Sequence, residues 1–174
     1  MGMDVYGLDS SNDAGEYFRA NVWYWRPLWD YCCEMHPDLV GDNPELGHYN
    51  DGYGLDDDGA MALGNSLLAD ITIYGTAQEY IDRRNAHLAS LPRLDCEWCN
   101  GTGIRTDKVG VEMGMPEKPL DEAAAVVLGR THGWCNGCSG EGKKNDWETE
   151  YSLDLETLTE FANFLVACGG FAIH

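Results

Sequence analysis

Basic residues are scarce in this sequence, because its 174 residues include 11 lysines and arginines against 30 aspartates and glutamates, a formal net charge of −19. A DNA- or RNA-binding surface needs basic side chains that neutralise phosphates, so we expect no direct nucleic-acid binding. The acidic excess leaves three explanations open. It can serve solubility, adapt the chain to high salt, or form a face that docks on a basic protein partner and gains association rate from electrostatic steering.

Long apolar segments and the common catalytic motifs are also absent. The longest apolar run, residues 123–128, is far shorter than the roughly 20 residues that span a bilayer, and no charged-then-apolar signal segment opens the chain. The sequence contains no G-x-S-x-G elbow, no glycine-rich phosphate loop with lysine and no H-E-x-x-H motif. These absences predict a soluble, cytoplasmic protein without membrane contact, and they favour a binding protein over an enzyme.

The apolar residues, 44% of the chain, are enough for one hydrophobic core. Their spacing predicts a mostly helical α+β domain. We expect a strand over 3–6, an edge strand over 171–174, a long loop over 36–58, and helices over 16–35, 57–71, 77–90, 122–128 and 153–168. Pro27 should divide the first of these helices. Thr76 and Glu79 match a capping box, and Asp121 should cap the helix over 122–128.

Four of the seven cysteines form two CxxC pairs, Cys96/Cys99 and Cys135/Cys138, in two copies of the pattern CxxCxGxG. Zinc prefers four tetrahedral ligands, and each CxxC turn offers two thiolates. The glycines of the pattern suit a backbone with positive φ that folds sharply around a metal. The sequence therefore predicts one zinc centre, which closes a long loop and contributes folding free energy. Two alternatives stay open: a pair of redox dithiols, and His132 in place of one thiolate.

The two units resemble the cysteine-rich region of DnaJ-type co-chaperones, where such units pair to hold zinc. The resemblance covers residues 96–142, with two units instead of four and a long insertion between them. It implies a zinc knuckle made of two CxxC hairpins. The segments MGMDVYG and YFRANVWYWRPLW, together with this region, resemble a family of small acidic bacterial and phage proteins. That resemblance implies a bacterial cell or a phage-infected host and brings no activity with it.

A second short motif, His36-Pro37-Asp38, matches the tripeptide through which J-domains engage their chaperone ATPase. A J-protein-like co-chaperone accessory is therefore an alternative function. The helix before that tripeptide should be basic in a J-domain, whereas residues 16–35 contain only Arg19 and Arg26 as basic residues.

The loop over residues 48–58 gathers one imidazole and several carboxylates. A metal-dependent enzyme that uses His48, Asp51 and Asp56–Asp58 is a further alternative, although the spacing is not that of the D-x-D-x-D-G calcium loop. The competing interpretation is an Asx-Gly turn, followed by aspartates that favour the start of the next helix through its dipole.

Two groups of side chains are candidates for partner binding. The first is aromatic and comprises Trp23, Trp25 and Trp29, since tryptophan dominates binding hot spots when it is exposed. The second is acidic and comprises Asp56, Asp57 and Asp58. The alternative for the tryptophans is an ordinary place in the core.

The predicted organisation has three parts. An acidic, aromatic-rich helical part covers residues 1–92, a zinc knuckle with its insertion covers 93–145, and a C-terminal helix and strand over 146–174 pack on the first part. We expect a zinc-stabilised acidic binding protein that acts by stoichiometric protein-protein contact. In a phage setting, it would inhibit a host or defence factor by occupying a basic, nucleic-acid-binding groove.

Overall fold

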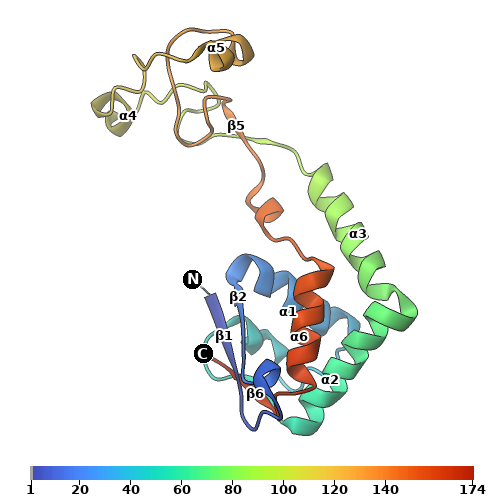
Figure 1. The fold of residues 1–174 in the computed structure, drawn as a ribbon. Coiled ribbons are helices and arrows are strands. Elements are labelled where there is room, and N and C mark those ends of the chain that lie inside the picture. Colours follow the sequence, from blue (N-terminus) through green and yellow to red (C-terminus); the bar gives the residue numbers. More distant parts are fainter. Residues whose placement is uncertain (1) are drawn as a thin grey trace. The chain divides into compact units, whose positions relative to one another are not determined.

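The computed structural model describes residues 2–174 and divides the chain into two compact units (Figure 1). The first unit comprises Met1–Ala89 with Glu150–His174, and the second is Ser90–Thr149. The fold is α+β and mostly helical, as predicted. No helix among the described residues is long and apolar enough to cross a membrane.

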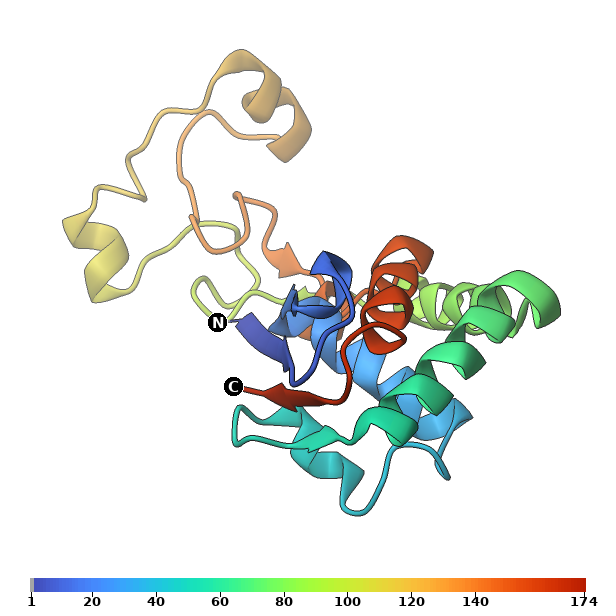
Figure 2. The ribbon, with the colours of Figure 1, turned by 60° about the horizontal axis from the view of Figure 1, so that its bottom comes forward.

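A four-stranded antiparallel sheet lies in the first unit, in the order β2-β1-β6-β3. Its strands are β1 (Gly2–Gly7), β2 (Tyr17–Asn21), β3 (Gly54–Leu55) and β6 (Phe171–Ile173). Figure 2 shows the C-terminal strand, in red, beside the N-terminal strand, in blue. The prediction of an edge strand at the C-terminus is wrong, because β6 pairs with β1 on one side and with β3 on the other.

The segment before Pro27 departs from the prediction of two helical pieces. Residues Tyr17–Asn21 form β2, in which Phe18 and Ala20 are buried and their neighbours are exposed, the period-2 pattern of a half-buried strand. The Asn21 side chain then caps α1 (Val22–Met35) by accepting the N–H groups of two following residues. The helix continues through Pro27, which is buried and removes only one hydrogen bond of the helix ladder.

Helices cover most of the remaining chain in the first unit. They are α2 (Asp57–Ala69), a π-helical turn (Asp70–Tyr74), α3 (Thr76–Ser90) and α6 (Leu155–Leu165), with 3₁₀ turns at Asp13–Gly15 and Pro44–His48. A further 3₁₀ turn, Trp147–Glu150, falls in the sequence at the boundary between the second unit and the first. The predicted capping box at Thr76 does not form as expected. Thr76 is already helical, and the carbonyl of Gly75, which has a φ of 70°, accepts the N–H of Glu79 instead.

The core of the first unit is rich in aromatic side chains. Trp25 and Trp29 are completely buried and stack with their ring centroids 5.8 Å apart. Each indole N–H donates to a main-chain oxygen, that of Gly47 for Trp25 at 2.8 Å and that of Pro44 for Trp29 at 2.7 Å. The prediction that these two tryptophans contact a partner is therefore wrong, because their apolar rings and their N–H groups are used inside the unit. Trp23 is 42% exposed.

The second unit has little regular structure. A two-stranded ladder joins β4 (Leu94–Asp95) to β5 (Lys143–Lys144), and two short helices, α4 (Lys108–Glu112) and α5 (Glu122–Leu128), lie in the insertion between the CxxC pairs. The predicted cap of α5 is confirmed, since Asp121 accepts the Ala124 N–H at 2.7 Å.

Candidate metal centre

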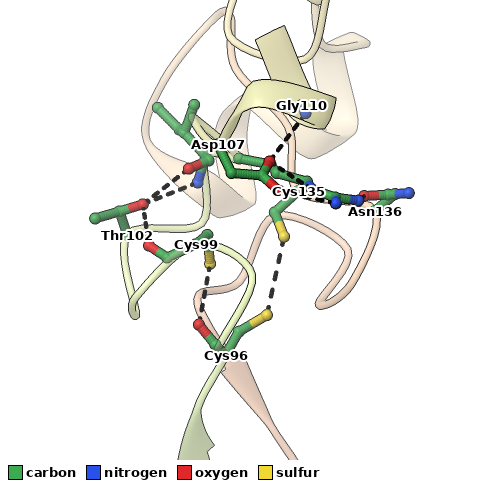
Figure 3. Close-up of polar contacts among 9 residues, drawn as sticks. Cys96, Cys99, Thr102, Asp107, Gly110, Cys135 and Asn136 are labelled. Carbon is green, nitrogen blue, oxygen red and sulfur yellow. Dashed lines mark hydrogen bonds and ion pairs between the residues drawn. The ribbon is translucent and has the colours of Figure 1, made fainter. Parts of the chain in front are cut away.

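Four cysteine side chains meet in the second unit. Their Sγ atoms all lie within 4.8 Å of one another, and the residues are buried. The Sγ atoms of Cys96 and Cys135 are 3.9 Å apart (Figure 3). Those of Cys99 and Cys138 are 3.7 Å apart. Four sulfurs about 2.3 Å from one ion in a tetrahedron would be about 3.8 Å apart. None of the seven cysteines forms a disulfide. The sulfur separations of this cluster are those of a metal site.

Each CxxC pair lies on a tight turn, and the two turns are built alike. In the first turn, the N–H of Gly101 bonds the Cys96 carbonyl at 3.3 Å, and in the second the N–H of Gly140 bonds the Cys135 carbonyl at 3.0 Å. Two further N–H groups point at sulfur: Gly103 donates to Cys99 Sγ at 3.3 Å and Gly142 to Cys138 Sγ at 3.2 Å. Such donors stabilise negative charge on a metal-bound sulfur.

The glycines of both repeats have the positive φ that the sequence predicts. The angles are 79° and 75° at Gly101 and Gly103, and 79° and 80° at Gly140 and Gly142. The glycines have a second role that the pattern did not indicate. A Cβ on Gly103 would lie 2.2 Å from the Gly140 carbonyl oxygen, and a Cβ on Gly142 would lie 2.2 Å from that of Gly101. The two turns therefore touch through their backbones.

The pKa values of two of the clustered thiols shift in opposite directions. Burial raises the pKa of Cys138 to about 12, although the Gly142 N–H opposes the change. Burial also acts on Cys96, but the Trp98 N–H and the neighbouring thiols outweigh it and hold its pKa below the ordinary value. A bound cation would favour all four thiolates.

Arg130, which lies in the insertion, links the two turns. Its Nη2 donates to the carbonyl oxygens of Gly103 at 3.0 Å and Gly140 at 2.7 Å, one from each turn, and its Nε donates to the Gly133 carbonyl at 3.4 Å. Sequence reasoning missed this residue, because a single arginine in a long insertion carries no motif.

A second arginine, Arg105, braces the outside of the cluster. Its guanidinium forms two hydrogen bonds with Asp107, at 2.8 and 3.0 Å, and a third with Asn136 at 3.1 Å. It also lies over the Trp98 ring at 4.5 Å from the centroid. Asp107 in turn accepts the Gly110 N–H at the start of α4, and these contacts lower the pKa of its carboxyl group. The first part of the insertion is thereby fixed to both CxxC turns.

The other candidate ligands lie outside the cluster. His132 Nδ1 bonds the Thr131 hydroxyl at 3.0 Å, and His132 is not among the grouped metal-ligand side chains. Among residues 2–174, the four cysteines are the only group of three or more potential ligands within such distances. The structure thus favours four thiolates over the alternative with histidine.

The structure does not bring together the loop proposed for a metal-dependent enzyme. His48 Nε2 pairs with Asp30 Oδ1 of α1 at 3.1 Å, while Asp51 is exposed. Asp56 accepts the Gly59 N–H at 2.9 Å as the cap of α2, and Asp57 and Asp58 are exposed in its first turn. This is the turn-and-cap arrangement of the competing interpretation.

The tripeptide His36-Pro37-Asp38 follows the end of α1. The His36 side chain is only 14% exposed, and its Nε2 lies 2.8 Å from Asp70 Oδ2, which also accepts the Tyr31 hydroxyl at 2.6 Å. A co-chaperone would need this histidine accessible, whereas here it belongs to a network inside the first unit.

Charge is divided unequally between the two units. The first unit contains 20 acidic residues and four basic ones, all arginine, whereas the second contains ten acidic and seven basic residues. Every lysine of the chain therefore lies in the second unit.

No family model, no curated protein and no solved structure matches the chain.

Proposed function

We propose that the four cysteines bind one Zn²⁺ ion with a structural role. Four sulfur donors within 4.8 Å of one another, with two pairs 3.7 and 3.9 Å apart, suit Zn²⁺, and a complete set of four protein ligands leaves no open position for a substrate. The ion would tie together two hairpins that 35 residues of sequence separate, and its binding free energy would stabilise the second unit.

The first unit carries the binding activity in this proposal. The chain acts as a zinc-stabilised acidic binding protein that contacts a protein with a basic, nucleic-acid-binding surface, such as a host or defence factor in a phage-infected cell. The observation behind this proposal is the 20 acidic against four basic residues of the first unit, beside ten and seven in the second. An acidic excess that served solubility alone would not need this division, whereas a docking face concentrates charge.

Elemental analysis of protein purified without chelator tests the metal proposal. We expect one zinc per chain, lost in Cys135→Ser and retained in Cys33→Ser, because Cys33 lies outside the cluster. A folded protein without stoichiometric transition metal would refute a zinc-stabilised unit.

Salt-dependent capture tests the partner proposal. Basic nucleic-acid-binding proteins from a bacterial lysate should bind the immobilised chain at low salt and be released as the salt concentration rises. Changing Asp56, Asp57 and Asp58 together to Asn should weaken capture while keeping a capping residue on α2. The matched control changes three carboxylates of the second unit, Glu112, Glu117 and Glu122, to Gln. Capture that is insensitive to salt, or equally weakened by both triple variants, would contradict an acidic docking face on the first unit.

A further inference from the structure

We propose that the edge strand β2 and the groove beside it bind an extended, lysine-bearing segment of the partner protein, which adds to the sheet as a fifth strand. This inference rests on the proposed function and specifies how one extended segment of the partner is held. Strand addition uses main-chain hydrogen bonds for affinity and alternate side chains for specificity.

The outer edge of β2 has free main-chain groups. The Gly7 N–H bonds the Glu16 carbonyl at 3.0 Å, which fixes the hydrogen-bonded positions of the β1-β2 ladder, and the register pairs Val5 with Phe18. Because these positions alternate along an antiparallel pair, the N–H and C=O groups of Tyr17 and Arg19 point away from β1. Within the described residues no hydrogen bond to these main-chain groups is found, so a strand can pair there.

A groove of about 340 Å³ follows the same strand. One wall comes from residues around β2 and the other from α6, which contacts β2. The lining residues are Ala14, Tyr17, Phe18, Arg19, Glu160, Asn163 and Phe164. The rings of Phe18 and Phe164, both almost completely buried, have their centroids 6.0 Å apart, and Glu160 is exposed. The groove therefore offers a long side chain from an added strand both the small accessible part of two aromatic rings and an exposed carboxylate.

Lysine fits this combination of surfaces. Its methylene stem can lie along apolar rings while its ammonium group reaches a carboxylate such as Glu160. The field of the first unit, with a net charge of −16, attracts such a segment and repels a second copy of the chain. We therefore identify the occupant as a basic partner segment and not as another copy.

The residues of the added strand that alternate with lysine would lie on the open face of the sheet, and this face favours neutral residues there. Arg19 Nε lies 3.4 Å from Asp4 Oδ1 of β1, so the two charges largely cancel. A charged residue in an edge strand commonly prevents edge-to-edge association. Here the guanidinium is drawn toward β1, across the sheet face, and the main-chain groups of Arg19 stay accessible.

The test uses the full-length protein and a blocked heptapeptide of alternating threonine and lysine, TKTKTKT. Amide chemical shifts in two-dimensional NMR report binding. We expect saturable shifts at Tyr17 and Arg19, and none with the glutamate counterpart TETETET. Arg19→Pro removes an outward N–H without removing a β1-β2 hydrogen bond, and should weaken peptide binding at least about tenfold. Arg19→Val removes the charge but keeps the N–H, and should bind at least as well as the wild-type chain.

Two further measurements keep the test independent of how Arg19→Pro folds. TKTKTKT that is N-methylated throughout lacks main-chain donors and should not bind the wild-type protein, and Glu160→Gln should weaken binding of the unmodified peptide. Equal binding of the methylated peptide, equal binding of TETETET, or absence of any shift at Tyr17 and Arg19 would overturn strand addition. If salt-sensitive capture of basic proteins persisted in those cases, the proposed function would stand without this site. Loss of capture with peptide binding intact would instead refute the partner proposed above.

Discussion

Gly103 and Gly140 belong to different CxxC turns, yet they touch so closely that a Cβ on Gly103 would lie 2.2 Å from the Gly140 carbonyl oxygen. The contact between Gly142 and Gly101 repeats this relationship. These two backbone contacts explain why both turns need glycine at equivalent places. The four sulfurs keep metal-binding separations because the turns that carry them fit directly against each other.

Gly103→Ala should destabilise the second unit and loosen its hold on metal. A φ of 75° costs an L-residue about 1–2 kcal/mol, and the clash with a backbone oxygen adds to that cost. Gly114→Ala is the matched control, because Gly114 has a φ of 68° and a Cβ added there would meet no atom within 4 Å. Thermal unfolding midpoints and the chelator concentration that removes half the metal would compare the two. Equal effects would show that the contact between the turns is unimportant.

Arg130→Met should speed metal loss to a chelator. The substitution keeps the apolar stem but removes hydrogen bonds to the Gly103 and Gly140 carbonyls, for an expected cost of about 2 kcal/mol. Lys108→Met serves as the control, since Lys108 has an 89% exposed side chain and only a 4.0 Å ion pair with Glu112. The release rate, followed with a metal-sensitive dye, should rise in the first variant alone. An unchanged rate would mean that Arg130 does not hold the turns together.

Much of the fold follows from local signals in the sequence. The cap at Asp121 and the apolar face of the C-terminal helix, including Phe161 and Leu165, have the structures that their patterns predict. The aromatic residues of Tyr17–Asn21 continue the apolar spacing of α1, and that spacing predicts a helix. Pairing with β1 decides that the segment is a strand, and such long-range pairing is invisible to a local pattern.

The candidate site, like the fold, is only partly predictable from the sequence. The four cysteines could be identified because the ligand type and spacing are set by the metal. Arg130 could not, because its function depends on where a 35-residue insertion returns to the turns. The burial of Trp25 and Trp29 was also beyond the sequence, since an aromatic cluster fits either a core or a contact surface until its indole partners are known.

Removing the metal should unfold the second unit and leave the first intact. The buried cluster found in the second unit consists of the four cysteines, whereas the first unit has a separate core that includes Trp25 and Phe161. Zinc contributes about 10–16 kcal/mol to the folding of small zinc peptides, so the second unit should lose its structure without it. Hydrogen exchange read by mass spectrometry should show loss of protection over residues 93–145 after chelation, and recovery with added zinc. Persistent protection of metal-free protein there would contradict a metal-dependent unit.

Cys33 should react unusually slowly with alkylating reagents at neutral pH. Of the three cysteines outside the metal cluster, Cys32 and Cys168 are completely buried and Cys33 is partly exposed. Burial, Asp30 and Glu45 raise the pKa of Cys33 to about 11, and the thiolate is the reactive form. Its reaction with iodoacetamide should therefore accelerate about tenfold for each pH unit between 8 and 10, whereas the rate of an ordinary thiol, with a pKa of about 8.5, approaches its maximum over that range.

Glu45→Gln removes a negative charge beside Cys33, so it should lower the pKa of Cys33 and speed the reaction at pH 8. Glu16→Gln removes a carboxylate that does not contribute to this shift and should leave the rate unchanged, and a flat pH profile in peptide mapping would contradict the raised pKa.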